Sequence, residues 1–111
     1  MYSISIKDVV AYLSRCKNTT LKNIQIILSE KPTPEWIKKF MEIWFNPRET
    51  TVLHAFNMSV ENNYIKMDCV PEDLVEKNLL IFKIVTSLTN NKLNEEEKLS
   101  RTSEIIRKYL L

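Results

Sequence analysis

The chain contains no glycine among its 111 residues, although an average usage of about 7% would supply roughly eight. This absence excludes the dinucleotide-binding fingerprint, the P-loop and the nucleophile elbow, because each of these motifs needs glycine. The tightest β-hairpin turns also rely on glycine, since they need positive φ angles. Helices need glycine only at their ends, where ten asparagines and four prolines are available instead. The missing glycine therefore favours an all-α fold.

Histidine and cysteine are also scarce. His54 is the only histidine, so catalytic schemes and metal sites that need two histidines are excluded. Cys16 and Cys69 are distant from His54 in the sequence, and we expect two reduced thiols packed as small hydrophobes, with a single disulfide as the alternative. The acids at 72–73 and 95–97 lie in predicted first helical turns, where they complement the helix dipole. We therefore predict a protein that is not an enzyme and has no metal or cofactor.

Neither positive nor negative charge is in large excess, because the sequence has sixteen Lys and Arg residues and fourteen Asp and Glu residues. With 44% hydrophobic residues, residues 1–111 are predicted to form one helical domain, and the absence of a helix stop signal near Leu111 is compatible with a domain cut from a longer chain. The longest strongly apolar run, 79–85, contains Lys83 and is too short to cross a bilayer. The first residues lack the basic and apolar regions of a signal peptide. We expect an intracellular protein, nuclear or cytoplasmic, that does not contact a membrane.

Helical spacing of apolar residues and capping residues together predict six helices. The clearest start is Thr33-Pro34-Glu35, which combines a capping hydroxyl, a proline at the first helical position and an early carboxylate. The fourth helix has an alternative end at Asn62-Asn63, which would leave residues 64–67 extended. The predicted helices cover 6–16, a segment from Leu21 that stops before Pro32, 34–45, 46–67, 71–88 and, after a break at 89–91, 94–110.

Short connections between these helices favour a compact bundle. The helices at 34–45 and 71–88 are apolar around most of their circumference, which predicts that they lie at its centre. The last helix has a single apolar face, formed by Leu99, Ile105, Ile106, Tyr109 and Leu110. The alternative architecture is a short α-solenoid of three hairpins, at 6–30, 34–67 and 71–110, although no residue-level repeat supports it.

The apolar excess of helix 34–45 gives the candidate site. If one face of this helix packs in the core, Trp36 and Ile43 lie at its edge, one heptad apart, with Lys39 nearby. Tryptophan is a favoured interface anchor, and such a strip suits an acidic amphipathic helix. The candidate partner-binding residues are therefore Trp36, Lys39, Phe40 and Ile43. Burial of the whole helix between two layers explains the same pattern and is favoured for each residue taken singly.

The predicted function is a docking or adaptor domain that binds a peptide or another protein subunit and does no chemistry. A structural homo-oligomer is one alternative, because helices 34–45 and 71–88 could bury their apolar excess against a second copy. A helical nucleic-acid-binding domain is the other, although the near-neutral net charge disfavours it. Its candidate basic clusters are Arg15-Lys17-Lys22, Lys38-Lys39 beside Trp36 and Phe40, and Arg101-Arg107-Lys108.

Overall fold

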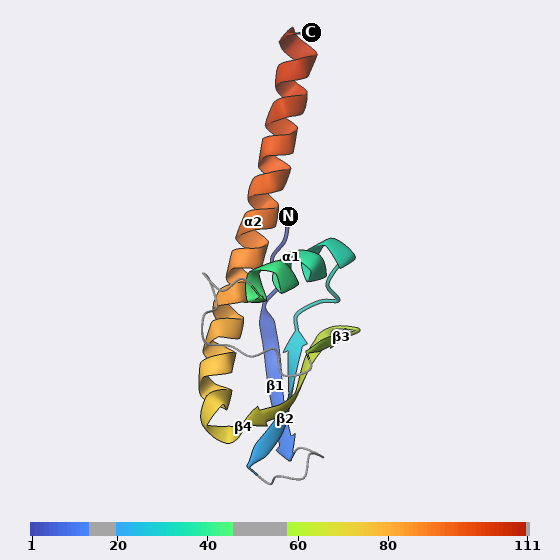
Figure 1. Ribbon diagram of the computed structural model, residues 1–111. Helices are drawn as coiled ribbons and strands as arrows, with labels where there is room; N and C mark the ends of the chain where they lie inside the picture. The colour runs from blue at the N-terminus through green and yellow to red at the C-terminus, as the bar shows by residue number, and fades with distance from the viewer. Residues whose placement is uncertain (14–19, 46–57, 111) are drawn as a thin grey trace.

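The computed structural model describes residues 1–13, 20–45 and 58–110, and it has a mixed α/β fold (Figure 1). The elements are strand β1 (Ile6–Leu13), strand β2 (Leu21–Leu28), helix α1 (Pro34–Trp44), strand β3 (Ser59–Glu61), strand β4 (Tyr64–Pro71), the 3-10 turn η1 (Glu72–Leu74) and helix α2 (Val75–Leu110). The predictions of an all-α bundle of six helices and of a three-hairpin solenoid are therefore both wrong. Two of the six predicted helices, at 6–16 and from Leu21, are strands in the described residues.

The four strands form one antiparallel sheet in the order β1-β2-β4-β3. β3 and β4 are joined by the two-residue turn Asn62-Asn63, in which Asn62 has a φ of 49°. Asparagine tolerates this left-handed conformation better than most residues. The turn that was expected to require glycine is thus made by asparagine, and this is why the absence of glycine did not exclude a sheet.

A second positive φ angle marks an irregularity between β2 and β4. The pairing register shifts between Lys22 and Ile24, and Cys69 on the opposing strand has a φ of 58°. The backbone N–H of Cys69 donates a hydrogen bond of 3.0 Å to Asn23 Oδ1. A side-chain amide therefore takes the place of a missing ladder hydrogen bond at this bulge.

The core lies between the inner face of the sheet and the two helices. β2 places Ile24, Ile26 and Leu28 on that face with a period of two residues, and all three are fully buried. β4 adds Ile65, Met67 and Val70, α1 adds Trp36, Phe40, Ile43 and Trp44, and α2 adds Phe82, Val85 and Leu93. Because both helices pack on one sheet face, neither is the centre of a bundle.

Helix α1 confirms the clearest helix start in the sequence. Thr33 is its N-cap, its hydroxyl accepts a hydrogen bond from the Trp36 N–H, and Pro34 occupies the first helical position. The structure ends α1 at Trp44, one residue before the predicted end. Residues 46–57, which hold the predicted start of the fourth helix, lie outside the described residues. Residues Ser59–Glu61 form strand β3, so the predicted fourth helix is wrong there under either of its two ends. Only the alternative's expectation that residues 64–67 are extended is confirmed.

Helix α2 is continuous for 36 residues, so the predicted break at 89–91 is wrong. Thr86 and Thr89 are buried, and their hydroxyls donate to the carbonyl oxygens of Phe82 and Val85, one turn earlier. At 1.5 Å per residue, α2 is about 54 Å long. The molecule measures 64 × 27 × 17 Å, and the C-terminal part of α2 stands clear of the sheet and of α1 (Figure 1).

Candidate protein interface at the end of α2

Three of the four predicted partner-binding residues are core residues. Trp36 and Phe40 have no exposed surface, and Ile43 is 3% exposed. Phe40 stacks on Trp36 with ring centroids 5.1 Å apart and contacts Phe82 of α2 at 4.9 Å. The apolar excess of α1 is therefore absorbed between the sheet and α2, as in the alternative interpretation of its pattern.

Lys39 is the one predicted site residue that stays at the surface. Its ammonium group lies 2.8 Å from Glu96 Oε1 and 3.6 Å from Glu42 Oε2, so it joins α1 to α2. The hydrogen bond to Glu96 is the main cause that raises the pKa of Lys39 above its ordinary value of 10.5. The same residues line a groove of about 280 Å³ between the two helices, with Leu93 at its base.

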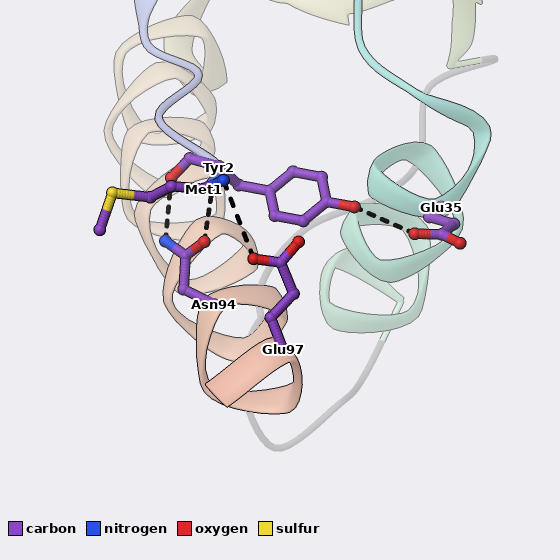
Figure 2. A network of polar contacts seen from close by, with 5 residues as sticks. All are labelled: Met1, Tyr2, Glu35, Asn94 and Glu97. Carbon is purple, nitrogen blue, oxygen red and sulfur yellow. Dashed lines mark hydrogen bonds and ion pairs between the residues drawn. The ribbon is translucent and has the colours of Figure 1, made fainter. Parts of the chain in front are cut away.

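The N-terminal segment is held against α2 by two asparagine side chains. Asn94 Oδ1 accepts a hydrogen bond of 2.7 Å from the Tyr2 N–H, and Asn94 Nδ2 donates one of 2.9 Å to the Tyr2 carbonyl oxygen (Figure 2). Asn90, one turn earlier, makes the same pair of bonds with Ile4. Its Oδ1 accepts a hydrogen bond of 3.3 Å from the Ile4 N–H, and its Nδ2 donates one of 2.7 Å to the Ile4 carbonyl oxygen. Each amide thus binds the backbone as a neighbouring β-strand would.

Further contacts beside Asn94 hold α2 against the N-terminal segment and α1. The Tyr2 hydroxyl donates to Glu35 of α1 at 3.0 Å, and the Met1 ammonium group lies 3.8 Å from Glu97 (Figure 2). The hydrogen bond to Glu35 and partial burial raise the pKa of Tyr2 above its ordinary value of 10.0. With the Lys39–Glu96 ion pair, these contacts attach α2 to the body of the molecule up to Glu97.

Beyond this point α2 continues as an exposed arm, residues 98–110. Every residue of the arm is exposed, yet it carries five large apolar side chains with exposed fractions of 50% to 77%. At about 100° per residue these side chains share one face, about 140° wide. We call this the arm face; its residues are Leu99, Ile105, Ile106, Tyr109 and Leu110.

The arm face is directed away from the core. The buried stripe of α2, which includes Phe82, Val85 and Leu93, is centred about 135° around the helix from the centre of the arm face. The exposed residues Leu80 and Ile84 lie on the same side of α2 as the arm face. Folding of the described residues therefore leaves this apolar surface uncovered.

The charges around the arm face are mostly positive. Lys98 lies just inside one edge of the face and Arg101 about 40° outside it, whereas Arg107 lies about 60° beyond the other edge. Glu104 lies on the opposite side of the helix. The ammonium nitrogen of Lys108 lies 6.0 Å from the centroid of the Tyr109 ring. Within residues 1–13, 20–45 and 58–110, none of the four bases of the arm has an ion pair with a carboxylate.

The sequence contained the signal for this surface. The apolar periodicity of 94–110 predicts one apolar helix face, which an all-α bundle would bury. An apolar helix face predicts that another apolar surface packs against it. The sequence does not show whether that second surface belongs to the same chain or to a partner. The arm face was therefore missed as a site, although its residues were identified as one face.

Other residues considered for chemistry are only partly within the described residues. Cys69 is in a disulfide bond, so the prediction of a reduced thiol is wrong for this residue. Cys16 and His54 lie outside the described residues, as do Arg15 and Lys17 of the first basic cluster. In the second cluster, the aromatic rings beside Lys38 are buried and cannot stack on bases.

Two searches of the described residues gave negative results. No cluster of three or more His, Cys, Asp or Glu side chains in this part of the chain is arranged to hold a metal ion. Among the same residues, no helix has the length and apolar character needed to cross a membrane.

Alkaline pH is expected to weaken the contacts that hold α2. The pKa values of Tyr2 and Lys39 are raised in the folded protein. The stability that their contacts give to the fold is therefore complete below the ordinary pKa values of 10.0 and 10.5, and it is lost as the pH rises through the raised pKa values. Urea unfolding from about pH 8 to about pH 11 should show a larger loss of stability for the wild type than for Tyr2→Phe combined with Lys39→Met. Equal losses in both proteins would contradict the assigned bonds.

No protein-family model, no curated protein and no solved structure matches this chain.

Proposed function

We propose that this chain is a non-catalytic protein–protein interaction domain that binds its partner through the arm face. The observation that carries the proposal is the exposure of Leu99, Ile105, Ile106, Tyr109 and Leu110 on one side of a helix that is attached to a packed body. Contiguous exposed apolar surface of this kind is typical of interaction sites. The arm is helical before any partner is bound, which reduces the conformational entropy lost on binding.

The arrangement favours recognition of the arm as a helix that packs along an apolar strip of its partner. Leu99 and Ile106 are seven residues apart and Leu110 is four residues further, which is the spacing of anchors in such complexes. A nucleic acid could engage the bases of the arm, but its phosphate backbone offers no apolar surface to cover the arm face. This supports a protein partner over the nucleic-acid alternative.

Polar substitution of the arm face is expected to abolish capture of the partner. Leu99→Gln combined with Ile106→Gln removes two exposed anchors and keeps residues that favour a helix, so thermal stability should barely change. The measurement is quantitative mass spectrometry of proteins retained from a lysate of the source cells by immobilised wild type and variant. The proposal is supported by a protein that the wild type retains and the arm variant loses.

The matched control changes a pair of exposed apolar side chains on strand β1 instead of the arm. Val10→Ser combined with Tyr12→Ser alters two partly exposed side chains of β1, and Tyr12 lies beside Val75 and Leu79, at the opposite end of α2 from the arm. This control should retain the same protein as the wild type. Identical sets of retained proteins for the wild type and the arm variant would show that the arm face is not the binding surface.

A further inference from the structure

We infer that the partner presents an acidic amphipathic surface, with an apolar strip bordered by carboxylates. This inference rests on the proposed function and specifies the chemistry of the surface that covers the arm face. It is argued from the charges of the arm, from the ion pairs at its base and from the position of Glu95.

The arm is mainly basic, and its bases concentrate along one border of its apolar face. Residues 98–110 contain Lys98, Arg101, Arg107 and Lys108 but only one acid, Glu104. Glu104 lies on the far side of the helix, about 170° from the centre of the arm face. A surface that covers the arm face therefore meets Lys98 and Arg101 along one edge, with Arg107 further around the other side, and carboxylates at its borders would complement these bases.

Two of the three acids just before the arm have partners on the body. Glu96 bonds to Lys39 at 2.8 Å, and Glu97 lies 3.8 Å from the Met1 ammonium group. Glu95 lies before the arm and Glu104 lies on the side of the helix opposite the arm face, so the arm face of another copy offers bases but no carboxylate. A second copy of the arm, packed face to face in either direction, would place bases against bases. The charges thus favour a different, acidic protein over self-association.

Glu95 sets the end of the binding surface. It lies in line with the arm face, between Leu99 and the exposed apolar residues Leu80 and Ile84. An anionic membrane lying flat along α2 would meet this carboxylate, whereas a partner of limited length can end before it. The surface from Leu99 to Leu110 is about 17 Å long, which corresponds to roughly three helical turns.

The experiment uses two synthetic helical peptides with the same leucine strip, one bordered by glutamates and one by lysines. Isothermal titration should show that the full chain binds the glutamate peptide at least about tenfold more tightly, and that added salt reduces this preference. Arg101→Glu combined with Arg107→Glu should reverse the preference. Lys77→Glu combined with Lys83→Glu changes the net charge of α2 equally but lies outside the arm, and should leave the preference intact.

Several results would overturn the inference. These are equal binding of the two peptides, binding of neither, arm-dependent binding to vesicles containing phosphatidylserine but not to the peptides, or arm-dependent dimers in light scattering. The experiments distinguish a failure of this inference from a failure of the proposed function. If Leu99→Gln with Ile106→Gln abolishes capture from lysate while Arg101→Glu with Arg107→Glu leaves capture unchanged, the arm face remains the binding surface and only its acidic partner is rejected.

Discussion

Replacing Trp36 with alanine is expected to lower the free energy of unfolding by about 3–5 kcal/mol, the usual cost of removing a buried tryptophan or phenylalanine. Trp36 has no exposed surface, and its ring stacks on Phe40. Its indole N–H also donates a hydrogen bond of 2.9 Å to Asn90 Oδ1, so α1, α2 and the N-terminal segment meet at this side chain. Alanine would leave a cavity at the centre of the core and remove one hydrogen bond.

Urea unfolding followed by far-ultraviolet circular dichroism measures this effect without relying on tryptophan fluorescence. Trp36→Phe keeps an aromatic ring in the core but loses the indole hydrogen bond, so it should cost clearly less than Trp36→Ala. An unchanged unfolding midpoint for Trp36→Ala would place the side chain at the surface, as the partner-anchor interpretation requires. The comparison therefore decides between the two interpretations of the α1 pattern.

The start of α1 was predictable because its signal is local. Thr33 and Pro34 act on the first helical turn through a capping bond and a fixed φ angle, and neither depends on the rest of the fold. The first two strands lacked such a signal. The spacing of Leu21, Ile24 and Leu28 suits a helix, whereas Ile24, Ile26 and Leu28 alternate as in a strand. Pairing with β1 and β4 decides between these patterns, and the sequence does not display that pairing.

The end of one helix and the start of another were predicted where α2 is continuous. Thr89, Asn90 and Asn91 resemble a break because their side chains often compete with helical hydrogen bonds. In the structure Thr89 bonds within the helix, and Asn90 binds the N-terminal segment more than eighty residues away in sequence. Long-range partners thus satisfy the polar groups that suggested a break.

The candidate site was misplaced for a related reason. The sequence identifies which residues are apolar and at what spacing, but the number of layers packed around a helix determines whether such residues are buried. α1 is covered by both the sheet and α2, so Trp36 and Ile43 are core residues. The arm has neither layer beside it, so Leu99 and Ile106 remain exposed despite forming an ordinary amphipathic pattern.

Replacing Asn90 with leucine is expected to cost about 2–4 kcal/mol, because loss of one partner leaves the remaining donors and acceptors unsatisfied. Three groups depend on this side chain: the N–H and the carbonyl oxygen of Ile4, and the indole N–H of Trp36. Ile4 is 4% exposed, so water replaces these bonds poorly. The measurement is urea unfolding, together with hydrogen exchange at the Ile4 amide, which should become faster.

Asn94→Leu is the matched control, one turn further along α2. Asn94 makes the same two bonds, but to Tyr2 near the surface, and it has no bond to an indole. We therefore expect a smaller loss, about 1–2 kcal/mol, with the Ile4 amide still protected. Equal losses for the two variants, or an unchanged Ile4 exchange rate in Asn90→Leu, would show that the amide pairs do not hold the N-terminal segment. If the losses differ as expected, the segment is anchored mainly at Ile4, and the contacts nearest the arm contribute less to the stability of the fold.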